Sequence, residues 1–107
     1  EAFLYALPGG SVHAAGRGEL LTKPLTFVGK QLNLNLKTSP GGSLKVELRD
    51  ASDKPLPGFT LADCQPLRGD FIDEPVKWSS DLSPLAGQPI RIRFVLEEVD
   101  LFAMQFK

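Results

Sequence analysis

The regular alternation of apolar and polar residues from Pro89 to Phe106 constrains the fold of this chain more than any other feature. The apolar positions are Ile90, Ile92, Phe94 and Leu96 before an acidic stretch, and Phe102, Met104 and Phe106 after it. A period of two places side chains on alternate faces of an extended strand, so each run predicts a strand with one buried face. The segment is therefore predicted to be a β-hairpin that turns at its acidic residues.

A second pair of alternating runs lies in the middle of the chain. The apolar positions are Leu32, Leu34 and Leu36 in the first run, and Leu44, Val46 and Leu48 in the second. Because the stretch Ser39-Pro40-Gly41-Gly42 between them is rich in turn-forming residues, the runs are predicted to form a central hairpin. The opposite face is polar, with Asn33, Asn35, Lys37, Lys45, Glu47 and Arg49. Arg91 and Arg93 extend this polar face if their strand is a neighbour.

The fold class follows from these half-buried strands. Antiparallel strands that are wet on one face must cover the other face with a second layer. Nine prolines and ten glycines separate the short apolar runs, as expected of many short strands. We therefore expect an all-β fold, a two-sheet antiparallel β-sandwich resembling a jelly roll. One short helical turn is expected near residues 81–87, capped by Asp81 and ended by Gly87.

The length and the remaining segments fit one compact unit. We expect residues 1–107 to form a single domain, which at this length hides about two thirds of its unfolded surface. Further short strands are predicted at Leu4–Leu7, Ser11–Ala14, Leu25–Val28 and Val76–Trp78. Between Thr60 and Trp78 the alternation lapses, which indicates a long ordered loop. Long loops on a rigid scaffold are where binding residues concentrate.

Composition excludes several classes of partner. Twelve basic and thirteen acidic residues give a net charge of -1 without a basic run, so nucleic acid is not expected as a partner. No apolar stretch approaches the roughly 20 residues that span a bilayer, so no membrane insertion is expected. The start lacks an initiator Met and a basic leader, as expected of a mature protein or a piece excised from a larger secreted protein. Cys64 is the single cysteine, for which a small buried side chain is the common role.

Catalytic and metal chemistry have weak support in the residues. A glycosidase needs two carboxyl groups about 5 to 9.5 Å apart across a cleft, and a small sandwich with short connections leaves no room for one. Ser11 and His13 lack the glycine-flanked elbow of a nucleophilic serine. The loop acids do not follow the spacing of a calcium loop, and hydrogen bonds to loop amides are their commoner use. The chain is therefore predicted not to be an enzyme, with no cofactor and with calcium not favoured.

Sugar recognition is the remaining chemistry that the residues suggest. An aromatic ring stacks on the apolar face of a sugar while nearby polar groups bond its hydroxyls. Trp78 is a candidate, although it shares a face with Val76 and a core tryptophan is the commoner outcome. The polar face is a second candidate, with a solvated surface as the ordinary alternative. Arg68-Gly69-Asp70 spells a tripeptide that integrins recognise, but three residues are too few to be specific.

An ordered series of short motifs resembles a known family. The motifs are Phe27 to Asn35, Thr38-Ser39, Val46-Glu47-Leu48, Pro57-Gly58-Phe59, Asp63-Cys64, Gly69-Asp70, Trp78 and Leu85 to Phe94. They resemble the C-terminal β-sandwich domain of bacterial proteins similar to glycoside hydrolase family 32 or to sialidases, where a five- or six-bladed propeller precedes it. The similarity extends from Ser11 to Phe106.

The resemblance implies a non-catalytic partner of a carbohydrate-active enzyme, secreted or periplasmic. The catalytic carboxylates of such enzymes belong to the propeller, so no catalytic residue transfers. The leading hypothesis is a carbohydrate-binding or carbohydrate-associated accessory module, with a glycan or an adjacent catalytic domain as partner. Its candidate ligand-binding residues are Trp78, Asp63, Arg68, Asp70, Asn33, Asn35 and Arg91. The alternative is a purely structural sandwich that braces a neighbouring catalytic domain through an apolar patch.

Overall fold

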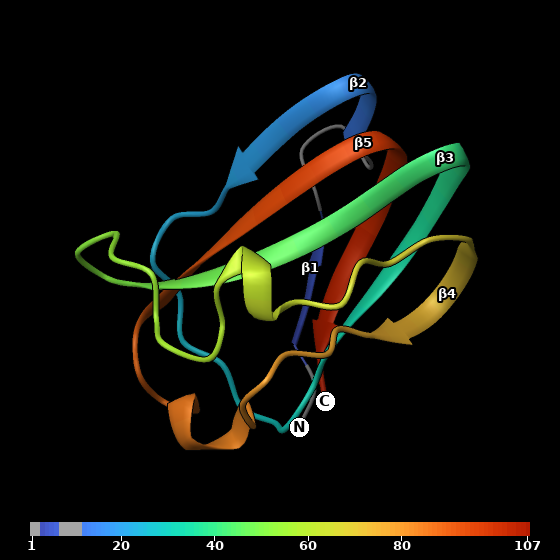
Figure 1. Cartoon of the computed structure of the whole chain (residues 1–107). Helices are drawn as coiled ribbons and strands as arrows, with labels where there is room; N and C mark the ends of the chain where they lie inside the picture. Colours follow the sequence, from blue (N-terminus) through green and yellow to red (C-terminus); the bar gives the residue numbers. More distant parts are fainter. Residues whose placement is uncertain (1–2, 7–11) are drawn as a thin grey trace.

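The computed structural model describes residues 3–6 and 12–107, with side chains described for residues 18–71 and 73–107. The strands are β1 (Phe3–Ala6), β2 (Val12–Leu21), β3 (Leu32–Asp50), β4 (Asp70–Pro75) and β5 (Ile90–Phe106). Two single 3₁₀ turns, η2 (Leu61–Asp63) and η3 (Ser83–Leu85), lie between them. The all-β prediction is confirmed (Figure 1). No helix among the described residues is long and apolar enough to cross a membrane.

The strands form one open antiparallel sheet in the order β1-β5-β3-β4, and β2 also pairs with β5. The long strand β5 is the centre of this sheet. It pairs with β3 along one edge, and with β1 and β2 in succession along the other. The expected division into two separate sheets is therefore replaced by a single connected sheet.

Both predicted hairpins are wrong. The runs that flank Ser39–Gly42 belong to the single strand β3, and the runs on either side of the acidic stretch belong to the single strand β5. The two strands pair with each other from Leu32 with Phe106 to Asp50 with Ile90. The alternating apolar residues do form buried faces, but each run pairs with a strand segment that is distant in the sequence.

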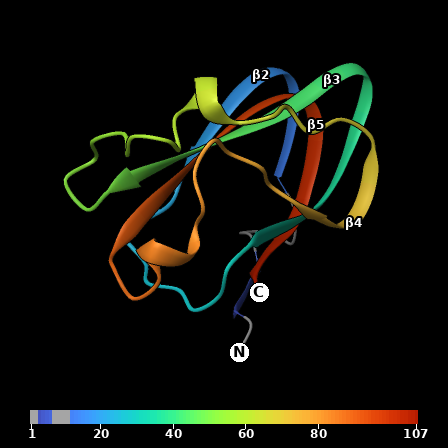
Figure 2. The same cartoon turned by 60° about the horizontal axis from the view of Figure 1, so that its bottom comes forward.

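The predicted reversal points are bends in these two strands. Four residues of β3, 39–42, face the single residue Glu98 of β5. Glu98 has a φ of 48° and Gly41 a φ of 82°, both in the left-handed region. A Cβ on Gly42 would lie 2.5 Å from the carbonyl oxygen of Glu98, so only glycine fits where the two strands bend side by side. The bends coincide, and the sheet curls over as one unit (Figures 1 and 2).

The curl places both halves of each long strand around one core. All six alternating apolar residues of β3 are fully buried, as are the four that begin β5. Phe27, which precedes β3, stacks on Phe106 with ring centroids 4.5 Å apart. Phe102 was predicted to face inward but is 37% exposed. A bulge next to it, where Leu36 faces Leu101 and Asn35 faces Ala103, turns its side chain outward.

The segment predicted as a long loop contains regular structure. Residues 61–63 form η2, and β4 runs from Asp70 to Pro75 beside the first half of β3. The predicted strand at Val76–Trp78 is wrong, because the sheet pairing ends at Pro75. The strand predicted at Leu25–Val28 is reduced to one bridge between Leu25 and Ile90.

The remaining short elements are close to their predicted positions. β1 and β2 overlap the strands predicted near the start, and residues 7–11 lie outside the described residues. The predicted helical turn is η3, but its N-cap is Leu82 and not Asp81. The carboxylate of Asp81 instead accepts a hydrogen bond from the backbone N–H of Ser83 at 3.0 Å, just before the turn. Gly87 follows with a φ of 84°.

Candidate functional site

Three shallow depressions open where residues 61–82 cover the edge of β3. The first, of about 270 Å³, is lined by Lys30, Gln31, Gln65, Val76, Lys77, Trp78, Ser80, Asp81 and Leu82. The second, of about 130 Å³, is lined by Gln65, Pro66, Leu67, Arg68, Phe71, Glu74, Pro75 and Lys77. The third, of about 300 Å³, is lined by Ser43, Lys45, Leu61, Arg68, Val95 and Glu97. Since Gln65 and Lys77 line the first two and Arg68 lines the last two, the depressions form one series, here called the loop groove.

Backbone hydrogen bonds hold the walls of the loop groove in place. The N–H of Gln65 donates to the carbonyl oxygen of Lys77 at 2.9 Å, which ties the two walls together. Leu67 exchanges two hydrogen bonds with Leu44 of β3, at 2.8 and 2.9 Å. These bonds give the irregular walls partners from the sheet, so the groove is a formed feature of the fold.

Trp78 lies in the first depression and is also part of the fold. Its indole Nε1 donates to the carbonyl oxygen of Val46 at 2.8 Å. Its ring meets Phe59 edge-on, with centroids 5.7 Å apart. The side chain is half-buried against the core, and Trp78 is one of the residues that line the first depression. The structure therefore shows Trp78 packed against the core, and its role in sugar recognition stays a prediction.

Cys64 bonds to the same residue of β3 as Trp78 does. The backbone N–H of Val46 donates to its sulfur at 3.3 Å, and the residue is 4% exposed. Burial raises the pKa of the thiol above its usual value. Cys64 and Trp78 thus bond both backbone groups of Val46 on the edge of β3 that faces away from β5. The predicted buried role of Cys64 is confirmed.

Asp63 organises the loop beside the groove. Its carboxylate accepts hydrogen bonds from the N–H and the hydroxyl of Thr60, at 3.1 and 2.9 Å, and from the hydroxyl of Ser79 at 3.0 Å. These donors favour the ionised form and hold the pKa of Asp63 below its usual value. Asp63 therefore orders its own loop, and it does not line any of the three depressions described above.

The structure separates the other predicted ligand-binding residues. Arg68 and Asp70 are exposed, on either side of Gly69, whose N–H donates to the hydroxyl of Thr38 at 2.7 Å. Asn33 was expected on an open polar face but is only 5% exposed. Its amide nitrogen donates to Asp73 at 3.0 Å, and its carbonyl oxygen is buried with no hydrogen-bond partner among the described residues. Asn35 is half-buried on the same half of β3.

Arg91 lies on the other half of the sheet, within a network of paired charges. Its Nε donates to the carbonyl oxygen of Thr22 at 3.0 Å, and its guanidinium is 3.9 Å from Asp53. The expectation that Arg91 and Arg93 extend the polar face of β3 is confirmed, because they face Arg49 and Glu47 across the β3–β5 pair. The expected single face bearing Asn33, Asn35, Lys45 and Arg91 is nevertheless divided by the bend of the sheet.

Glu47 is the centre of this network, here called the charge ladder, which comprises Glu19, Glu47, Arg49, Asp53, Arg91 and Arg93. Glu47 is 6% exposed and accepts from Arg49 at 2.8 Å and from Arg93 at 3.4 Å. Arg93 also pairs with Glu19 on β2. Hydrogen bonds from Arg49 to Glu47 and Asp53 raise the pKa of its guanidinium further. These charges are satisfied within the fold.

The groove has the chemistry of weak polar recognition. It offers amide groups, ammonium and guanidinium groups, carboxylates and one half-buried indole in open depressions. Among the described residues, no three His, Cys, Asp or Glu side chains are grouped to hold a metal ion. Gln65, Lys77 and Lys30 line the groove but were not singled out from the sequence. The only signal for Gln65 and Lys77 is that each adjoins a buried anchor, Cys64 or Trp78.

Comparison of the chain with protein-family models, curated proteins and solved structures found no match. The chemistry of the groove and the motif series therefore form the basis of a functional proposal.

Proposed function

We propose that this chain is a non-catalytic carbohydrate-binding accessory module of a secreted or periplasmic glycoside-hydrolase-like enzyme, and that glycan binds in the loop groove. The curled sheet serves as a sandwich-like scaffold for this site. The observation that carries the proposal is the first depression, where a half-buried indole adjoins two glutamine side chains, two lysines and Asp81. An aromatic surface next to amide and charged groups is the combination that sugars require.

The shape of the groove favours binding over catalysis. Its three parts have volumes of about 130 to 300 Å³ and open to solvent, which places them at or below the lower end of the range for ligand pockets, so each can hold part of an extended ligand. An open site of this kind leaves water around the ligand, and its hydrogen bonds exchange with those of solvent. Binding is therefore expected to be weak.

Titration of the isolated chain with a panel of oligosaccharides tests the proposal. Trp78 is the single tryptophan, so its fluorescence reports directly on the first depression. Gln65→Ala should weaken binding by about fivefold, the equivalent of one lost hydrogen bond. The matched control is Gln88→Ala, which removes an exposed glutamine that lines none of the three depressions and should leave the affinity unchanged.

Failure of every oligosaccharide to change the fluorescence or the amide shifts would contradict the proposal. The alternative would then be a structural module that braces a neighbouring catalytic domain. The described residues contain three exposed large apolar side chains, Leu21, Val28 and Phe102. A brace predicts that replacing them with serine destabilises the parent enzyme, whereas changes in the loop groove do not.

A further inference from the structure

We infer that the ligand of the loop groove is an extended acidic glycan, a chain of sugars that carry carboxylate or sulfate groups. This inference rests on the proposed function and specifies its ligand. It follows from the positions of the cations in the three depressions and from the absence of salt bridges to those cations within the described residues.

The cations occupy the junctions of the groove. Lys77 lines the first and second depressions, and Arg68 lines the second and third. A chain that passes through all three must therefore contact both cations. Lys30 and Lys45 stand in the two outer depressions, so positive side chains accompany the whole path. Arginine binds carboxylate or sulfate oxygens through two parallel hydrogen bonds, and lysine acts as a point charge.

Lys45, Arg68 and Lys77 are free to pair with a ligand, whereas Lys30 lies close enough to Asp81 to contribute, after the hydrogen bonds from Ser83, to lowering the pKa of that carboxyl. In the described part of the chain, none of the four cations forms a salt bridge, whereas Arg49, Arg91, Arg93 and Lys107 all do. Lys30, Arg68 and Lys77 are also exposed, so their ammonium and guanidinium groups reach the opening of the groove. A cation that already has a carboxylate partner must break that pair to bind another anion, whereas Arg68 and Lys77 at the junctions have no such pair among the described residues.

Three carboxylates limit the kind of anion that fits. Glu74, Asp81 and Glu97 each line one depression, so four cations are interspersed with three acids. A polyanion with one charge at every step, such as nucleic acid, would meet these carboxylates and be repelled. A glycan with spaced acidic groups can place its charges at Arg68 and Lys77 and its hydroxyls at the carboxylates, which accept hydrogen bonds.

The test compares three hexasaccharides of similar length. One is built of uronic acids, the second is the same chain with its carboxyl groups reduced to alcohols, and the third is sulfated. We expect each of the two acidic chains to bind at least tenfold more tightly than the reduced chain. We also expect this difference in affinity between acidic and reduced chains to shrink as ionic strength rises from about 0.05 to about 0.5 M, because salt screens exposed charges.

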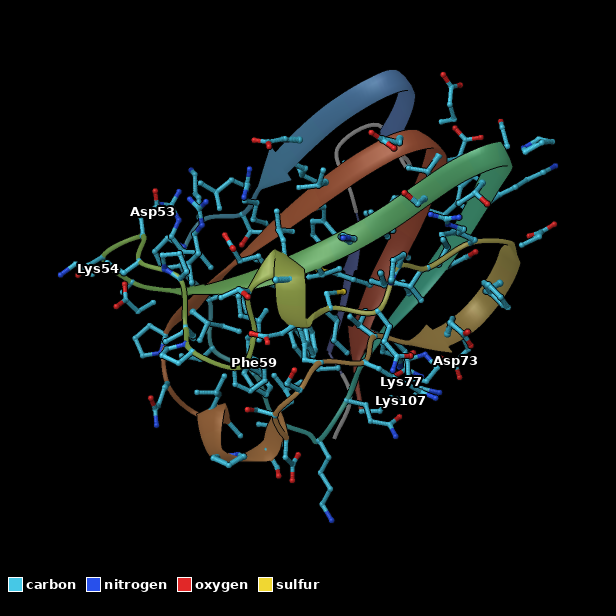
Figure 3. All side chains as sticks on the ribbon, viewed as in Figure 1. Asp53, Lys54, Phe59, Asp73, Lys77 and Lys107 are labelled. Carbon is cyan, nitrogen blue, oxygen red and sulfur yellow. The ribbon has the colours of Figure 1, made fainter. Side chains whose placement is uncertain are left out.

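Charge removal at the junctions provides the second arm. Arg68→Gln and Lys77→Gln should each weaken binding of the acidic chain by about fivefold more than they weaken binding of the reduced chain. Glu74→Gln should strengthen binding of the acidic chain. The matched control is Lys54→Gln, at the tip of a turn well away from Lys77 (Figure 3), which should have no effect. Unchanged unfolding midpoints would show that each variant folds.

The outcomes separate the inference from the proposed function. Equal binding of the acidic and reduced chains would overturn the inference and leave a glycan-binding module. Binding of the acidic chain that is equally weakened by Lys54→Gln would also overturn it, because general attraction to positive charge would then explain the preference. If none of the three hexasaccharides and no member of the wider panel binds, both the inference and the proposed function fail.

Discussion

The charge ladder and the loop groove use the same residue types in opposite ways. In the ladder, Glu47 is 6% exposed and bonded to two arginines, and the charges across β2, β3 and β5 are paired. In the groove, Arg68 and Lys77 are exposed and lack a salt bridge within the described residues.

The difference has its origin in strand register. Glu47 faces Arg93 because β3 and β5 pair in register, and this pairing brings the two charges together. The groove walls are mainly irregular segments, which have no repeating register to supply partners for their charges. Ordered loops beside a rigid sheet can therefore present unpaired charges such as Arg68 and Lys77 to a ligand, while Glu47 and Arg93 on the sheet pair with each other.

The largest effect on stability is expected in the ladder. Glu47→Ala leaves Arg49 and Arg93 without their shared carboxylate in a mostly buried position. We expect a loss of about 2 to 3 kcal/mol in the free energy of unfolding, below the range for fully buried pairs because both arginines reach solvent. Urea unfolding followed by circular dichroism measures it. The matched control, Glu97→Ala at an exposed groove position, should change stability by less than about 0.5 kcal/mol. Equal losses in the two variants would remove the distinction between the surfaces.

A smaller effect on stability is expected at Trp78, which lines the groove and bonds to β3. Trp78→Phe keeps an aromatic ring near Phe59 but removes the donor to the carbonyl oxygen of Val46. We expect a loss of about 1 to 2 kcal/mol in the free energy of unfolding, the cost of leaving that oxygen without its partner. Thermal unfolding by circular dichroism measures it, since the variant has no tryptophan fluorescence. A variant as stable as the original chain would mean that the indole hydrogen bond contributes nothing.

The smallest effect on stability is expected from the ionisation of Asp63, whose carboxylate orders the loop beside the groove. Because the pKa of Asp63 in the fold is held below its ordinary value of 3.8, its ionised form stabilises the fold above that value. This contribution disappears as the pH falls through the lowered pKa. Asp63→Asn should therefore be less stable at pH 7 and should lose less stability than the original chain on acidification below about pH 4.

Urea midpoints at several pH values check this expectation. Asp70→Asn is the matched control, because Asp70 is exposed and accepts none of the side-chain hydrogen bonds found among the described residues. It should be as acid-sensitive as the original chain. Parallel pH curves for Asp63→Asn and the original chain would contradict a role for the hydrogen bonds of Asp63 in stabilising the loop.

The candidate site was predictable in location but not in composition. The lapse of alternation between Thr60 and Trp78 correctly indicated the region where the groove forms. Trp78 and Arg68 do line it, whereas Asn33 is buried against Asp73 and Arg91 belongs to the charge ladder. The spacing of polar residues records which face they occupy, but it does not show whether another segment will cover that face.

The sequence by itself determined most of the apolar core, because a period of two fixes the face of each residue along a regular strand, although it did not predict the exposure of Phe102 or the burial of Asn33. Leu32 to Leu48 and Ile90 to Phe106 therefore contain most of the predicted core. Only the tertiary structure decided the pairing. A hairpin turn and a bend at Ser39–Gly42 preserve the same alternating faces, so the pattern cannot distinguish them. The close contact of Gly42 with Glu98, residues distant in sequence, made each predicted hairpin one curled strand of a shared sheet.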